Sequence, residues 1–80
     1  MSSGKSKKFG GDELDGNGFS DRLRELRERR RMSRLVLGQL CGLSKNMIAK
    51  YERGERVPSV KNLVILADFF AVTVDDLLGR

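Results

Sequence analysis

The amino-acid sequence predicts an all-α domain of five short helices around one core. Apolar residues recur at intervals of three and four, which is the period of a helix packed on one side. A serine or threonine able to cap a helix stands before each such stretch. No stretch alternates apolar and polar residues or shows a hairpin turn, so we expect no sheet. With 80 residues, the chain has room for one small domain.

The first two expected helices have recognisable ends. Ser20 can cap the first, and its apolar residues fall on one stripe. The second runs from the cap Ser33 to Cys41 and stops at Gly42, which tolerates a left-handed turn. The core residues predicted from these two helices are Phe19, Leu23, Leu26, Leu37, Leu40 and Cys41.

Three further helices follow directly. The third starts from the cap Ser44 and ends before Gly54, the fourth is capped by Ser59, and Thr73 caps a last turn. Their apolar residues again share one side of each helix. The core residues predicted here are Met47, Ile48, Tyr51, Val60, Leu63, Leu66, Ala67, Phe70, Leu77 and Leu78.

Residues 1–18 differ from the rest in composition. They hold five of the nine glycines and show no apolar periodicity, so we expect a disordered N-terminal tail before a domain at residues 19–80. The tail's charges cancel, since three lysines precede three acidic residues. The net charge of +5 therefore falls on the domain, which favours an acidic polymer such as nucleic acid as partner.

Composition also excludes several classes of protein. With one cysteine, Cys41, and no histidine, the chain offers neither an internal disulfide nor a Cys/His metal site. We expect Cys41 to be a small core residue in a reducing cytoplasm. No apolar stretch is long enough to span a membrane. No catalytic constellation, cofactor site or small-molecule site is indicated, so we do not expect an enzyme.

Two short helices joined by the tight turn 41–44 are the sequence form of a helix-turn-helix. At about 100° per residue, the apolar side chains of helix 44–53 share one arc. Asn can pair with adenine, Lys can donate to guanine, and an Ala methyl can pack on a thymine methyl. A lysine on a helix face is also commonly just solvated. The outward arc that would read bases carries Lys45, Asn46, Ala49 and Lys50.

Five segments recur at characteristic distances from this turn, at residues 22–27, 37–44, 48–54, 58–59 and 72–78. Through them the chain resembles the lambda-repressor-like family, also called Cro-type or XRE-type helix-turn-helix regulators, over about residues 19–79. The resemblance implies a transcriptional repressor at the nucleoid that binds double-stranded DNA with helix 44–53 in the major groove. The alternative is an antitoxin-like or other protein–protein interaction module on the same fold, in which the positive charge is incidental.

The resemblance also assigns roles to single residues. It places Lys45, Asn46 and Lys50 at base-reading positions, and Arg34 where the family commonly has Gln against the DNA backbone. Helix N-termini and nearby arginines supply phosphate contacts. We interpret the run 29–31 as a solvated helix end. The expected phosphate-binding residues are Arg34, Ser44, Arg53 and Arg56.

Arg27 and Glu52 match an ion pair between the first helix and the recognition helix in the family. The alternative is that Arg27 pairs locally along its own helix. An inter-helix pair would fix the pose of the recognition helix, and loss of one partner would strand a partly buried charge.

The fourth helix carries two apolar residues outside its predicted core arc. Ile65 and Phe69 lie one turn apart and would form an exposed patch of the kind that marks interfaces. The alternative is a slightly rotated helix that buries Phe69. The resemblance adds Val57, Val74 and Leu78 to this surface and implies a homodimer on a palindromic operator.

Overall fold

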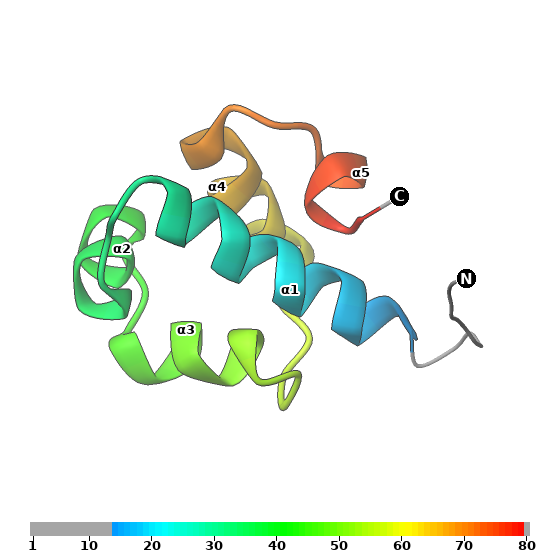
Figure 1. The fold of residues 1–80 in the computed structure, drawn as a ribbon, viewed down its shortest axis with the longest axis horizontal. Helices are drawn as coiled ribbons and strands as arrows, with labels where there is room; N and C mark the ends of the chain where they lie inside the picture. The colour runs from blue at the N-terminus through cyan, green and yellow to red at the C-terminus, as the bar shows by residue number, and fades with distance from the viewer. Residues whose placement is uncertain (1–13, 80) are drawn as a thin grey trace.

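A computed structural model describes residues 14–79, with side chains from Gly18 onward; residues 1–13 of the predicted tail lie outside this range. The all-α prediction is confirmed: the described residues form helices and no strand, and none of these helices is long and apolar enough to cross a membrane. In Figure 1, α3 lies on one side of α1, α4 and α5 lie on the other, and α2 closes one end. The helices are α1 (Leu14–Arg29), α2 (Arg34–Cys41), α3 (Lys45–Glu52), α4 (Val60–Phe70) and α5 (Val74–Leu77).

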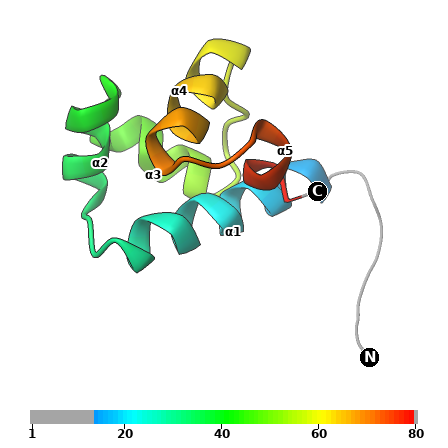
Figure 2. The same cartoon turned by 90° about the horizontal axis from the view of Figure 1, so that it is seen from above.

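Helix α1 begins at Leu14, so the predicted start at Ser20 is wrong, and residues 14–18, which composition assigned to the tail, are helical. The C-terminal turn explains the difference. A Cβ added at Gly18 would lie 2.9 Å from the carbonyl oxygen of Leu78, so the helix packs closely against the far end of the chain there. Figure 2 shows α5 beside the start of α1. Such a contact is invisible to local composition.

The other four predicted caps are confirmed. The hydroxyl of each accepts a hydrogen bond from the backbone N–H three residues further on, which fixes where the helix starts. Gly42 ends α2 with φ at 73°, in the left-handed region that glycine adopts without strain. Only residues 42–44 separate α2 from α3. The capping residues are Ser33, Ser44, Ser59 and Thr73.

All five helices contribute to the core. Two predicted core residues are exposed instead, Leu40 by 61% and Val60 by 77%, while Leu63 lies at the core's edge. In α2 the buried residues are Leu37, Gly38 and Cys41, and Leu40 lies outside this buried side. Val60 is the first residue of α4, whose buried positions start later along the helix. The buried apolar residues are Phe19, Leu23, Leu26, Leu37, Cys41, Ile48, Tyr51, Leu66, Ala67, Phe70 and Leu77.

Gly38 marks the closest approach of α2 to the turn that leads into α3. The backbone N–H of Leu43 donates to the Gly38 carbonyl oxygen at 2.7 Å. A Cβ added at Gly38 would lie 2.5 Å from the carbonyl oxygen of Leu43 and 3.2 Å from the carbonyl carbon of Ser44. Both are backbone atoms, so they can yield only if the turn shifts. This glycine therefore helps to set α3 relative to α2.

We predict that Gly38→Ala lowers the free energy of unfolding by about 1 to 3 kcal/mol, because overpacking outweighs the better helix propensity of alanine. Urea denaturation measures the change. Gln39→Ala is the matched control, since Gln39 is exposed on the same helix and should tolerate the substitution. A Gly38→Ala variant as stable as the parent chain would show that the turn moves at no cost.

Candidate nucleic-acid interface

Helix α3 has a buried side and an outward side. Ile48, Tyr51 and Glu52 are buried against the other helices. The side chains predicted to read bases lie away from them: Lys45 and Asn46 are exposed, and Ala49 and Lys50 are half-buried. We call these four residues the outward arc.

Tyr51 anchors α3 to two neighbouring helices. Its carbonyl oxygen accepts a hydrogen bond from the buried hydroxyl of Ser20 on α1 at 2.6 Å, and its own hydroxyl accepts one from Asn62 Nδ2 on α4 at 3.0 Å. The rings of Tyr51 and Phe19 meet edge to face, with centroids 5.7 Å apart. Sequence patterns gave no sign of the Ser20 and Asn62 contacts, because both join residues distant along the chain.

Arg27 and Glu52 form a two-point ion pair between α1 and α3. Arg27 Nε lies 2.6 Å from Glu52 Oε2, and Nη2 lies 3.0 Å from Oε1. The Glu52 side chain is fully buried and that of Arg27 is 12% exposed. The hydrogen bond to Glu52 raises the pKa of Arg27 above its ordinary value. Arg27 Nη1 also donates to the carbonyl oxygen of Met32 at 2.8 Å, which fixes the loop before α2.

Arg34 joins the same carboxylate. Its Nε donates to Glu52 Oε1 at 3.0 Å, while 40% of its side chain stays exposed. From sequence, Arg34 was expected only to touch DNA phosphate, and the second ion pair was missed. The available signal was a basic residue at a position where the family commonly carries the neutral Gln.

An open surface hollow of about 490 Å³ lies beside this cluster. It joins the end of α1 to the starts of α2 and α3. Two of its lining residues, Arg34 and Lys45, come from the sets predicted to contact DNA. The lining residues are Arg27, Ser33, Arg34, Leu35 and Lys45.

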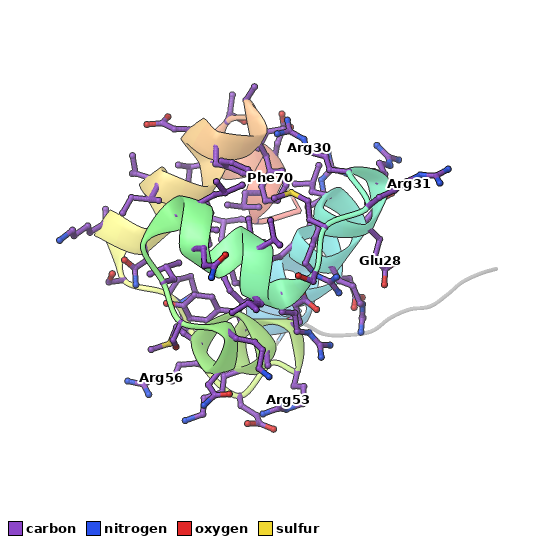
Figure 3. All side chains as sticks on the ribbon, turned by 90° about the vertical axis from the view of Figure 1, so that its left-hand side faces the viewer. Glu28, Arg30, Arg31, Arg53, Arg56 and Phe70 are labelled. Carbon is purple, nitrogen blue, oxygen red and sulfur yellow. The ribbon has the colours of Figure 1, made fainter. Side chains whose placement is uncertain are left out.

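The predicted phosphate-binding residues beyond α3 lie on the surface. In Figure 3, Arg53 and Arg56 both point outward near the end of α3. Arg53 is paired with Glu55, with Nε 2.7 Å from Oε2 and half of each side chain exposed. This hydrogen bond raises the pKa of Arg53 and lowers that of Glu55. A phosphate at Arg53 would therefore have to displace Glu55. Ser44 is exposed, and its oxygen accepts the cap hydrogen bond.

Arg30 does more than solvate a helix end. Its guanidinium lies 5.3 Å from the centre of the Phe69 ring and 5.1 Å from that of Phe70, and it donates to both of their carbonyl oxygens. Figure 3 shows Arg30 and Phe70 side by side. The interpretation of residues 29–31 as purely solvated is therefore wrong for Arg30, which caps the C-terminal end of α4.

The predicted dimer surface needs correction. Ile65 and Phe69 are half-buried and pack against the core, Phe69 beneath Arg30, so they do not form an exposed patch. Val74 and Leu78 are also half-buried. Of the predicted set, Val57 is freely exposed, at 79%. We use the name valine patch for Val57 and the two exposed valines of α4, Val60 and Val64.

Cys41 is buried at the end of α2, where burial raises the pKa of its thiol. It packs within the core cluster, as expected of a small apolar residue. A thiol with a raised pKa carries little thiolate at neutral pH and is a poor nucleophile.

The sequence pattern of the helix-turn-helix family matches residues 23–77, and the chain belongs to this family. The HTH-type transcriptional regulator AnsR of Bacillus subtilis is 47% identical over 60 residues, which make up 75% of this chain and 52% of AnsR. The chain thus spans about half the length of that relative. The resemblance to lambda-repressor-like regulators is confirmed at the level of the family.

Solved structures agree with the fold. The restriction-modification controller protein C.AhdI from Aeromonas hydrophila matches with a TM-score of 0.73 and 35% identity, over 79% of this chain and 96% of that one. The P22 c2 repressor, solved with a synthetic operator, matches with a TM-score of 0.74 and 30% identity, over 78% of this chain and 96% of that one. The hydroxypropylphosphonic acid epoxidase of S. wedmorenis matches with a TM-score of 0.74 and 24% identity, over 82% of this chain and 35% of that enzyme. At this identity the match shows only that the fold is shared.

We predict that Glu52→Ala lowers the free energy of unfolding by about 3 to 5 kcal/mol, because it leaves Arg27 partly buried without its carboxylate. Chemical denaturation measures the change. Glu55→Ala, which removes the exposed partner of Arg53, is the control and should leave the unfolding midpoint where it was. A Glu52→Ala variant that loses less than about 1 kcal/mol would contradict a structural role for the buried pair.

Proposed function

We propose that the chain binds double-stranded DNA in a sequence-specific manner and regulates transcription, as a repressor, with α3 in the major groove. One observation carries the proposal: buried contacts fix one side of α3, and the outward arc offers amide, ammonium and methyl groups that suit base edges. The family and the named regulators among its relatives support it.

Phosphate contacts would hold α3 in register with the duplex. Arg34 and Ser44 lie at the starts of α2 and α3, and Arg53 and Arg56 lie at the far end of α3. Cations at both ends of a groove-reading helix contact the backbone without reading sequence. The net charge of +5 supports the same partner. Such a regulator would act at the nucleoid in the cytoplasm, by binding and without catalysis.

We further propose that two copies bind a palindromic operator through the valine patch. Val57 and Val60 are 79% and 77% exposed, and Val64, one turn after Val60, is 41% exposed. Adjacent exposed apolar residues mark interfaces in small domains. A single recognition helix reads only a few base pairs, so a second copy would double the site. This patch replaces the surface expected at Ile65 and Phe69.

A second candidate function has its own observation. The outer face of α2 exposes Leu35 by 50%, Val36 by 40% and Leu40 by 61%, which suits a protein–protein interaction module. The salt dependence of binding separates the two functions. Phosphate-driven binding to DNA weakens steeply as salt is added, whereas an apolar protein contact does not.

We predict that Asn46→Ala and Lys50→Ala each cost about 1 to 3 kcal/mol of binding free energy and relax the preference at particular base pairs. Arg34→Ala should weaken binding to all sequences alike, because a phosphate contact carries no sequence information. Sequencing of the duplexes that each variant selects from a random library measures the preferences. Equal, sequence-independent losses for all three variants would overturn the assignment of base readers.

We predict that changing Val60 and Val64 together to Lys yields a folded monomer with weakened binding to a palindromic site, because like charges would meet at the interface. Analytical ultracentrifugation measures the oligomeric state. The control changes Val36 and Leu40 to Lys, an exposed pair with the same spacing on α2, and should stay dimeric. A parent chain that is monomeric at concentrations saturating the site, or a dimeric Val60/Val64 variant, would exclude this surface.

A further inference from the structure

We propose that Glu52 is a positioning residue for DNA binding: through its ion pair with Arg34, it directs the terminal amino groups of Arg34 toward a backbone phosphate in the hollow between α2 and α3. The inference rests on the proposed function. It assigns to a buried residue that cannot itself touch DNA a role in how tightly DNA is held.

The geometry of Arg34 is the first support. A guanidinium is planar and carries its donors in a rigid fork, so fixing Nε also fixes where Nη1 and Nη2 can lie. Nε is fixed by Glu52 Oε1 at 3.0 Å. Among residues 18–79, whose side chains the structure describes, the Arg34 side chain makes no other hydrogen bond, so its terminal amino groups keep their donors for a ligand. The side chain is 40% exposed and lines the hollow.

The balance of charge is the second support. Three cations line the hollow: Arg27, Arg34 and Lys45. Two carboxylates pair with them, the buried one of Glu52 with Arg27 and Arg34, and the exposed one of Glu28 with Arg27 at 3.9 Å. Three positive charges against two negative charges leave an excess of one, which matches the single negative charge of a phosphodiester. A phosphodiester brings one negative charge and two free oxygens, which a guanidinium can bind at two points. Lys45, the first residue of α3, is also among the lining residues of the hollow.

The positioning effect and simple electrostatics act in opposite directions. A free arginine side chain loses many rotamers when it binds, and a side chain already held in place loses fewer, so removal of Glu52 should weaken binding through Arg34. Removal of a negative charge should by itself strengthen attraction to DNA. The sign of the change in affinity for a Glu52 variant therefore separates the two effects.

The experiment measures the affinity of the full chain for a mixed-sequence duplex over a range of salt concentrations, because a phosphate contact needs no particular sequence. We expect Glu52→Gln to bind several-fold more weakly, although the net charge rises from +5 to +6. In an Arg34→Ala background, Glu52→Gln should cause a much smaller loss, because only its effect through the pair with Arg27 remains. A purely structural role predicts the same fold-change in both backgrounds, and that result would overturn the proposal.

A second variant keeps the carboxylate in place, since Glu52 also supports the fold. Arg34→Lys retains the charge but has one ammonium group, which can meet either Glu52 or a phosphate. We expect it to lose about tenfold in affinity, nearly as much as Arg34→Ala. Arg24→Ala is the control for charge, because Arg24 is 43% exposed and pairs with the exposed Asp21; it should lose much less.

The outcomes separate this inference from the proposed function. Arg34→Lys that binds as tightly as the parent chain, or Glu52→Gln that binds more tightly, overturns the positioning role while DNA binding stands. A parent chain without salt-dependent binding to any duplex refutes the proposed function itself.

Discussion

The carboxylate of Glu52 joins three of the five helices at one buried point. Glu52 belongs to α3, and its carboxylate accepts two hydrogen bonds from Arg27 of α1 and a third from Arg34 of α2. Removing a carboxylate from water is costly, and the cost is offset here because each oxygen accepts at least one hydrogen bond from a guanidinium. The orientation of α3 therefore depends on the ion pairs that Glu52, on the buried side of α3, makes with Arg27 and Arg34. Glu52 thus contributes to the stability of the fold and, in our proposal, to DNA binding.

Backbone constraints give this cluster its rigid frame. Ser33 and Ser44 cap α2 and α3, Gly42 turns the chain between them, and Gly38 leaves no room for a side chain against the turn. Tyr51 then fastens the end of α3 to α1 and α4. A site carried by helices that are fixed at both ends can present side chains without ordering a loop first, which favours tight binding.

The parts of the fold that sequence predicted are those with local causes. Four caps, the stop at Gly42 and the buried stripe of α3 follow from residues within one or two turns of each other. The errors arose where distant segments meet. Gly18 of α1 packs closely against Leu78, in the stretch by which α1 exceeds its predicted length. Arg30 packs on the ring of Phe69, which lies 39 positions further along the chain. Within the site, the outward arc followed from helical periodicity. The Arg34–Glu52 pair did not, because it joins residues eighteen positions apart on different helices.

The central claim is that the outward arc of α3 and the hollow beside Glu52 form one DNA-binding surface. A titration of the isotope-labelled chain with a duplex selected from a random library tests it most directly, because amide chemical shifts report contacts residue by residue. The account predicts shifts concentrated at the starts of α2 and α3 and along the outward arc, with the side-chain signals of Arg34 among the largest. Shifts concentrated instead on the outer face of α2 around Val36 and Leu40, without shifts at Arg34 or along the outward arc, would contradict it.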